Sequence, residues 1–210
     1  APAPAIAVAP IPTPPPAPPI APAPPAAAAL VAPPRAGKPS PGTVVPGAEL
    51  ADAKIAADAA GQWAAGASAG SQYDRVQYSA AKATGAPDVG VAGDSVNAWC
   101  SASQSSGTDW LEVTFAHAVR SVGVRVRQNH NPGAIVKVEA LEADGTSHVW
   151  WEGVDPFVAP AIRDIAWFGL SVPPTDYAVA RIKLTLNLAA VPGWKQIDAV
   201  QLVAADGTGK

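Results

Sequence analysis

The chain has 210 residues, a formal net charge of −3 and 24 prolines, most of which lie before Gly47. Its Lys and Arg residues are scattered, so they form no basic stripe for nucleic acid, and outside the Pro-broken N-terminus there is no apolar run of the ~18 residues that a membrane span needs. The composition therefore argues against a nucleic-acid partner and a membrane span. The roughly 160 residues from Gly47 onward are enough for one domain with a sizeable core.

The start of the chain, Ala-Pro-Ala-Pro with no Met, is typical of a protein after removal of a secretory signal that ends in small residues. An artificial start of the chain would look the same. We expect a secreted, extracellular or cell-surface protein whose signal peptide has been removed. The single Cys100 excludes a disulfide within the chain, so it is either a small buried residue or a bond between two chains.

Residues 1–46 form a Pro/Ala-rich arm, which we expect to be polyproline II because Pro removes backbone donors and clashes with the preceding helical turn. A solvated spacer is the commonest role of such a tract. This arm, however, has almost no charge before Arg35 and carries apolar side chains that a spacer does not need, namely Ile6, Val8, Ile11, Ile20, Leu30 and Val31. They predict an arm that packs on copies of the same chain, as a homo-oligomer or a filament.

An Ala-rich connector, residues 47–61, follows the arm. Its apolar residues Leu50 and Ile55 give only a weak 3.6-residue period, which indicates at most a short helix.

Apolar and polar side chains then alternate at period two, which is typical of half-buried antiparallel strands. Asp144-Gly145 predicts a hairpin turn, and a change of frame at Asp198-Ala199 predicts a β-bulge. Many short strands without useful helical periodicity predict an all-β fold, an antiparallel β-sandwich or jelly roll over residues 62–205, with a tail at 206–210. The faces expected to be buried are Leu111, Val113 and Phe115; Val122, Val124 and Val126, with Arg125 and Arg127 opposite; and Ile182, Leu184 and Leu186.

Four motifs follow one another in this region: QWAAGASAGSQYDRVQYSAAKATGAPDVGVAGDSVNAWCS, which contains a Trp and a Ser-rich strand ending in Tyr, then DWLEVTF, NHNPGAIVKVEAL and VPGWKQIDAVQLV. Their order resembles the galactose-binding-like β-sandwich of discoidin and coagulation factor 5/8 C-type modules, in particular its bacterial extracellular copies, from Trp63 to about Val203. The resemblance is specific for fold and poorly specific for function. The chain departs from it after Trp63, where Ala and Gly replace bulky residues and predict a thin first strand able to pack closely against another backbone.

Catalysis is not favoured by the residues. Gly66-Ala67-Ser68-Ala69-Gly70 matches the G-x-S-x-G pattern of a hydrolase elbow but lacks its strand-to-helix context, and His117, His130 and His148 lack zinc-ligand spacing. Trp99 and Trp110 are interpreted as packing residues. We therefore expect a protein that is not an enzyme.

The family resemblance implies that the ATGAPD…GD loop, if it binds an inorganic ligand, holds Ca²⁺ through Asp88 or Asp94 together with backbone carbonyls. A structural loop without metal is the alternative, because Asp is common in loops.

Glycan contacts are predicted where aromatic side chains exceed what a core can hold. Trp150 and Trp151 are adjacent and point to opposite faces of a strand, so at most one of them fills the core. The candidate contacts to a glycan or partner are Trp150, Trp151, Trp167, Asn129, His130 and Asn131. The leading hypothesis is a secreted, non-catalytic structural protein that assembles through its arm, and the alternative is a carbohydrate-binding or adhesion module on a Pro-rich tether.

Overall fold

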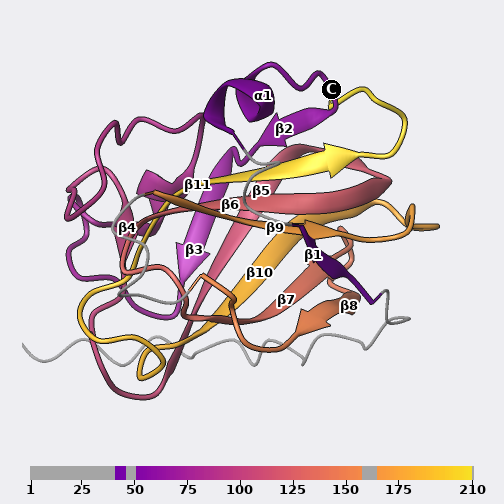
Figure 1. Cartoon of the computed structure of the whole chain (residues 1–210). Coiled ribbons are helices and arrows are strands. Elements are labelled where there is room, and N and C mark those ends of the chain that lie inside the picture. The colour runs from indigo at the N-terminus through magenta and orange to yellow at the C-terminus, as the bar shows by residue number, and fades with distance from the viewer. Residues whose placement is uncertain (1–40, 46–50, 158–164, 210) are drawn as a thin grey trace, which may run out of the picture. The chain divides into compact units, whose positions relative to one another are not determined.

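The computed structural model describes residues 41–45, 51–157 and 165–209. The chain divides into two units, Ala1–Pro33 and Pro34–Lys210, and the elements described below belong to the second (Figure 1). The apolar arm residues, from Ile6 to Val31, lie outside the described residues. Polyproline II and assembly through the arm therefore stay predictions.

Two antiparallel sheets form the domain (Figure 1). The six-stranded sheet has the order β1 (Thr43–Val45), β9 (Ala166–Ser171), β6 (Ser121–His130), β11 (Gln196–Ala204) and β2 (Gly61–Trp63), and β4 (Trp99–Cys100) pairs with β11. The five-stranded sheet has the order β3 (Gly66–Ala69), β5 (Thr108–Val119), β10 (Val179–Asn187), β7 (Ile135–Leu141) and β8 (Ser147–Glu152). The predicted all-β class with antiparallel sheets is confirmed.

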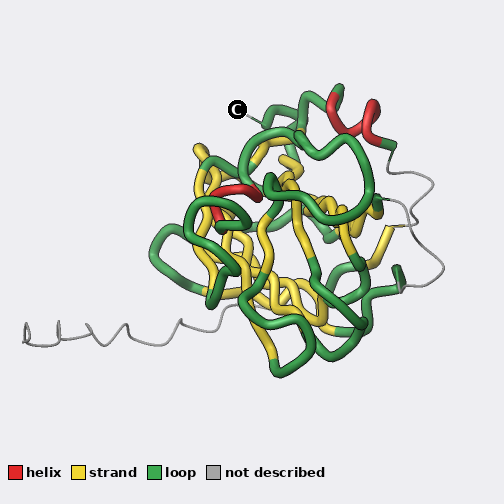
Figure 2. Tube along the Cα trace, turned by 90° about the vertical axis from the view of Figure 1, so that its left-hand side faces the viewer, coloured by secondary structure: helices red, strands yellow, loops and turns green. Residues whose placement is uncertain are grey.

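Within the described part of the chain, two short helices accompany the sheets: α1 (Asp52–Ala56) and a 3₁₀ turn, η2 (Ala80–Ala83). Figure 2 shows both of them outside the strands. The weak helical period of the connector thus corresponds to a real but short helix, in which Ile55 is buried, whereas Leu50 lies outside the described residues.

The core lies between the sheets, and the predicted alternation places its side chains. Leu111, Val113 and Phe115 are all buried, as are Ile182, Leu184 and Leu186. The largest core side chains satisfy their polar atoms, because Trp99 Nε1 donates to the carbonyl of Ser71 at 3.1 Å and Trp150 Nε1 donates to the hydroxyl of Tyr177 at 2.8 Å. Burying one such apolar side chain contributes about 1.5–3 kcal/mol, so the core provides the main stabilisation of a domain without an internal disulfide.

Local turn chemistry also agrees with the sequence. β7 and β8 form an antiparallel hairpin in which Gly145 has a φ of 92°, a left-handed conformation that favours glycine. The register of β11 against β6 shifts between Ile197 and Ala199, which is the bulge predicted at Asp198-Ala199.

The prediction of polyproline II is wrong for residues 43–45 of the arm. Thr43–Val45 do not continue polyproline II but form β1, which pairs antiparallel with residues 169–171 of β9. Thr and Val are β-branched and favour a strand, and β1 lies at the edge of its sheet. The thin strand predicted after Trp63 is β3, an edge strand whose close backbone partner is β5 of the same chain.

Candidate functional site

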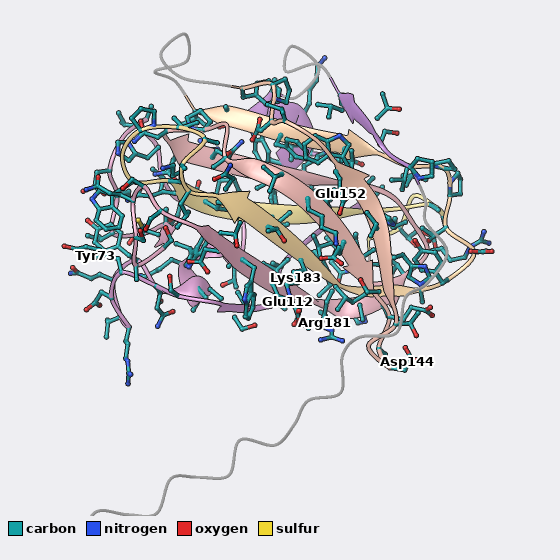
Figure 3. The ribbon with its side chains drawn as sticks, turned by 90° about the horizontal axis from the view of Figure 1, so that it is seen from below. Tyr73, Glu112, Asp144, Glu152, Arg181 and Lys183 are labelled. Carbon is teal, nitrogen blue, oxygen red and sulfur yellow. The ribbon has the colours of Figure 1, made fainter. Side chains whose placement is uncertain are left out.

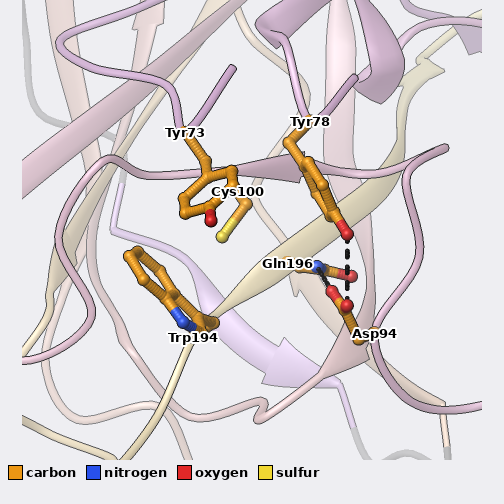
Figure 4. Close-up of a pocket in the computed structure, with 6 residues that line it drawn as sticks. All are labelled: Tyr73, Tyr78, Asp94, Cys100, Trp194 and Gln196. Carbon is orange, nitrogen blue, oxygen red and sulfur yellow. Dashed lines mark hydrogen bonds between the residues drawn. The ribbon is translucent and has the colours of Figure 1, made fainter.

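A pocket of about 100 Å³ lies beside β4 and the start of β11 (Figure 4). Figure 3 places Tyr73, one of its residues, at one end of the sandwich and Asp144, of the β7–β8 turn, at the other. The lining residues come from three distant segments: Tyr73, Tyr78, Asp94, Cys100, Trp194 and Gln196.

Three aromatic rings form the wall of the pocket. The Tyr73 ring contacts Tyr78 edge-to-face at 5.3 Å between centroids, and contacts Trp194 edge-to-face at 5.1 Å. Tyr73 is 58% exposed, so its ring is open to solvent. Both tyrosines are tied to Cys100, because Tyr73 N donates to the Cys100 carbonyl and Cys100 N donates to the Tyr78 carbonyl. The irregular loop is thereby anchored on β4.

A carboxylate stands beside these rings. Asp94 Oδ2 accepts from the Tyr78 hydroxyl at 3.1 Å, and its Oδ1 accepts from Gln196 Nε2 (Figure 4). Gln196 is buried, and its Oε1 accepts from Ser95 N and from Asn129 Nδ2, each at 2.9 Å. Because every polar atom of the Gln196 side chain has a partner, the amide fixes the orientation of the Asp94 carboxylate.

The electrostatics of the pocket keep its weak acids protonated. The pKa of Tyr78 is raised by desolvation and then by the hydrogen bond and charge of Asp94. Burial, followed by the charge of Asp94, raises the pKa of Cys100 to about 12. At neutral pH the Cys100 group is a thiol and not a nucleophilic thiolate. It is buried, in agreement with the simpler of its two interpretations.

The aromatic residues predicted as glycan contacts lie elsewhere. Trp150 is fully buried, and Trp151 is half-buried and packs edge-to-face on Phe168 at 5.2 Å. Trp167 is 5% exposed, and its Nε1 donates to Asp52 Oδ1. Trp150 and Trp167 thus offer no open ring face, and none of the three tryptophans lines the pocket.

The polar residues predicted as glycan contacts lie next to the pocket. Asn129 hydrogen-bonds to Gln196, His130 is the register partner of Gln196, and Asn131 Nδ2 donates to the Trp194 carbonyl at 2.7 Å. Asn131 has a φ of 43°, a left-handed conformation that Asn tolerates. These residues support the pocket from behind.

Sequence reasoning missed Tyr73, Tyr78 and Trp194. The sequence analysis assigns no ligand contact to these three residues, and their rings meet only after β11 pairs with β4. The available signal was the Pro-Gly-Trp sequence that ends one residue before β11, since turns between strands lie at the surface and often carry binding residues.

The predicted calcium ligands, Asp88 and Asp94, are both exposed. Within the part of the chain that the structure describes, no group of three or more His, Cys, Asp or Glu side chains could hold a metal ion. Calcium stays a prediction, and nothing below depends on it.

The G-x-S-x-G match lies in an edge strand. Ser68 is in β3, paired with Glu112 of β5, and not on the strand-to-helix turn that a nucleophile elbow needs. Among the described residues no helix is long and apolar enough to cross a membrane.

A second hollow, of about 220 Å³, lies over β6 and β9. It is lined mainly by strand residues from Val122 to Arg125 and from Gly169 to Ser171. Its cationic side chain, Arg125, is already paired with Asp58 at 2.7 Å. Without aromatic rings this hollow is a weaker candidate for a ligand site.

Comparisons with known proteins give one family and several similar folds. Residues 53–209 match the family described as Pappalysin-1, SD scarf domain, C-terminal. No curated protein matches the chain.

Similar solved structures include the CBM32-1, CBM32-2 and M60 catalytic domains of ZmpB from Clostridium perfringens, with 14% identity, a TM-score of 0.53, and 80% of this chain and 17% of that chain covered. They also include the family 32 CBM of C. perfringens NanJ in complex with galactose, with 17% identity, a TM-score of 0.43, and 68% and 98% covered. A third is a mutant Ruminococcus gnavus GH29 fucosidase in complex with fucose, with 14% identity, a TM-score of 0.47, and 73% and 27% covered. At such identities the likeness concerns the fold, and it confirms the galactose-binding-like β-sandwich expected from the sequence motifs.

Proposed function

The chain belongs to the family of the C-terminal SD scarf domain of pappalysin-1, and from this premise we propose that it is a carbohydrate-binding module whose sugar enters the pocket between Tyr73, Tyr78 and Trp194. The observation that carries the proposal is the pocket itself: three aromatic rings and one oriented carboxylate, brought together at the end of a rigid sandwich. The matched solved structures include modules named for carbohydrate binding, which supports the proposal.

The chemistry of the pocket suits a sugar ring. A pyranose has an apolar C–H face that packs on aromatic rings and hydroxyl groups that need fixed acceptors. Tyr73 and Trp194 supply ring surface, and the Asp94 carboxylate supplies an acceptor held in place by Gln196. The pocket, at about 100 Å³, is small compared with the ~300–1,000 Å³ of drug-sized sites. It therefore suits one terminal sugar and not a long segment of a chain.

A binding role fits the pocket better than hydrolysis. Glycoside hydrolysis commonly uses two carboxylates on either side of the scissile bond, whereas the residues that line this pocket include one, Asp94. Cys100 is held as a neutral thiol and Gln196 is not titratable, so neither provides the missing acid or base.

Glycan-array screening followed by calorimetry tests the proposal. We expect saturable binding of a glycan, weakened at least about tenfold, or ~1.4 kcal/mol, by Tyr73→Ala or by Trp194→Ala. Val76→Ala is the matched control, because Val76 is 76% exposed in the same loop but does not line the pocket. The proposal fails if no glycan binds, or if both aromatic variants bind as the unaltered chain does. If only Trp151→Ala loses binding, the glycan binds at the β8 edge and not in the pocket.

Assembly through the arm is a separate hypothesis that the described residues do not address. Light scattering of the full chain and of a chain that starts at Pro41 tests it, since the second retains β1. We expect the full chain to be the larger species, and equal masses would contradict the hypothesis. Secretion likewise stays a proposal, in keeping with an extracellular glycan ligand.

A further inference from the structure

The charged side chain of the pocket restricts the chemical class of the ligand more than its aromatic rings do. Among the described residues, Asp94 takes part in no ion pair with Lys, Arg or His. The other lining residues are Tyr, Cys, Trp and Gln, so no cation neutralises Asp94 from within the pocket.

The neighbouring cations are directed elsewhere or lie outside the lining. Lys195 follows Trp194 in the sequence, but it is buried, and its Nζ donates to the carbonyls of Gln104, Leu188 and Gly193. Arg75 is exposed in the loop between the two tyrosines and is not a lining residue. The charge of Lys195 acts on Cys100 from behind the pocket wall, and the one charged side chain that a ligand meets among the lining residues is the carboxylate of Asp94.

One further observation agrees with a pocket that lacks positive charge. Behind Gln196, the Oδ1 atom of Asn129 is buried and has no hydrogen-bond partner in the described structure. Asn129 binds Gln196 through Nδ2, so this spare acceptor lies one hydrogen bond from the pocket wall.

Aromatic faces beside a carboxylate attract a cation. A ring carries negative charge on its face and binds an ammonium group within ~6 Å of its centroid. Tyr73 holds Tyr78 and Trp194 edge-to-face, and Tyr78 donates its hydroxyl directly to Asp94. The rings and the carboxylate thus form one continuous surface for a group that is positively charged and partly apolar.

We propose that the pocket prefers a sugar that carries a protonated amine, such as a terminal glucosamine unit, over N-acetylated or carboxylate-bearing sugars. The ammonium group pairs with Asp94 while the C–H face of the sugar packs on the rings. An N-acetyl group has no charge to pair, and a uronic or sialic acid brings a second negative charge next to Asp94. This inference rests on the proposed carbohydrate-binding function.

Calorimetry with the full chain tests it on three ligands of equal length: a β-1,4-glucosamine oligosaccharide, its N-acetylated counterpart and a uronic acid oligosaccharide. We expect the amino form to bind about tenfold more tightly than the N-acetylated form and the acidic form to bind most weakly. The preference should decline as added salt screens the exposed charge. It should also decline as the pH rises and the ligand amine loses its proton.

Asp94→Asn is the decisive variant, because it removes the charge while the amide oxygen can still accept one of the two hydrogen bonds that Asp94 receives, from Tyr78 or from Gln196 Nε2. We expect it to lose the preference for the amino form and to retain binding of the N-acetylated form. Asp88→Asn is the matched control, since Asp88 is an exposed carboxylate of the same loop that does not line the pocket. If Asp94→Asn does not fold, the salt and pH series on the unaltered chain still decides.

The outcomes separate this inference from the function on which it rests. Equal affinity for the amino and N-acetylated forms, or a preference that survives in Asp94→Asn, overturns the amino-sugar inference and leaves carbohydrate binding intact. Tetramethylammonium that competes as strongly as the glucosamine oligosaccharide shows recognition of the cation alone, and also overturns it. Absence of binding to any sugar removes the proposed function itself.

Discussion

The outer faces of the two sheets carry similar charged residues in opposite settings. On the five-stranded sheet, Arg181 pairs with Glu112 at 2.8 Å, and both side chains keep part of their surface in water (Figure 3). On the six-stranded sheet, Arg127 pairs with Asp198, and these side chains are 3% and 1% exposed. The same strand alternation thus places a partly solvent-exposed ion pair on the five-stranded sheet and a buried ion pair on the six-stranded sheet.

The helix α1 accounts for much of the difference, because it covers part of the outer face of the six-stranded sheet. Asp52 at its start accepts from Arg127 Nη2 at 2.9 Å and from Trp167 Nε1 at 2.5 Å. Ile55 packs with Trp167, which is 6.5 Å from the Trp63 ring. The carbonyl of Val89, in a separate loop, accepts from Arg127 Nη1 at 2.7 Å. Arg127 is therefore the point where connector, loop and sheet meet.

This contrast separates two kinds of energetic contribution. An exposed ion pair contributes about 0–1 kcal/mol, because water solvates each partner nearly as well. Breaking a buried pair is more costly than its presence is beneficial, since the remaining charge stays desolvated. Equal-looking pairs on the two faces should therefore respond very differently to mutation.

The largest effect is expected for Arg127→Ala. The substitution leaves Asp198 buried without its cation and removes the contacts to Asp52 and to the Val89 carbonyl. We expect a loss of about 3–5 kcal/mol in the free energy of unfolding, measured by urea denaturation at neutral pH. A loss below ~1 kcal/mol would show that burial does not distinguish this pair from an exposed one.

A double variant provides the control. Arg127→Met combined with Asp198→Asn removes both charges and keeps most of the side-chain volume. We expect it to recover much of the stability that Arg127→Ala loses, because no unpaired buried charge remains. If the double variant is as unstable as the single one, packing and not charge is the cause.

The pH dependence of Arg127→Ala has a definite sign. Burial already raises the pKa of Asp198, in spite of the hydrogen bond and charge of Arg127, which lower it. A carboxyl whose pKa is raised in the folded state holds its proton more tightly when folded, so stability falls as the pH rises from the unfolded value, 3.8, through the folded value. Removing Arg127 raises the folded pKa further. The deficit of the variant should therefore shrink as the pH is lowered, and a deficit that grows in acid would contradict this account.

An intermediate effect is expected for Asp52→Asn. Desolvation raises the pKa of Asp52, but the hydrogen bonds from Trp167 and Arg127 and the charge of Arg127 outweigh it, so the pKa is lowered from 3.8. The resulting stabilisation is present above pH 3.8 and is lost as the pH falls through the folded pKa. Because the Asp52 side chain is 58% exposed, we expect a loss of only about 1 kcal/mol at pH 7.

Urea denaturation at pH 7 and at acidic pH, followed by tryptophan fluorescence, measures this effect. The asparagine still accepts from Trp167, so helix docking should persist while the acid-dependent part of the stability disappears. An Asp52→Asn chain that loses as much stability in acid as the unaltered chain would assign that acid dependence to another group.

The sequence predicts the local parts of this arrangement well. Alternation places Leu111 and Ile182 in the core, Asp144-Gly145 forms the hairpin turn, and the frame change at Asp198 is a bulge. Each of these features depends on neighbours only a few residues away. The same alternation places Arg125 and Arg127 on the outer side of β6, but it does not reveal that α1 and a loop bury Arg127 there.

The candidate pocket could not be predicted for the same reason. Its rings come from the loop before η2 and from the turn before β11, and only the pairing of β11 with β4 brings them together. The sequence contains more aromatic side chains than one strand face can bury, but it does not show which of them other elements cover. Trp167 is covered by α1 and Trp150 lies in the core, whereas Tyr73, which was not among the predicted glycan contacts, is open to solvent.

The smallest effect is expected for Arg181→Ala on the five-stranded sheet. Arg181 donates to Glu112 through Nη1, and its Nη2 donates to the Glu142 carbonyl at 3.4 Å. The side chains of Arg181 and Glu112 are 28% and 19% exposed, so water can replace the lost contact when the guanidinium is removed. We expect a loss of at most about 1 kcal/mol in the free energy of unfolding, and a smaller loss in 1 M salt, where the screening length falls to ~3 Å. Urea denaturation of Arg181→Ala and Arg127→Ala side by side checks the contrast between the faces, and equal losses would mean that α1 does not change the energetics of the charges beneath it.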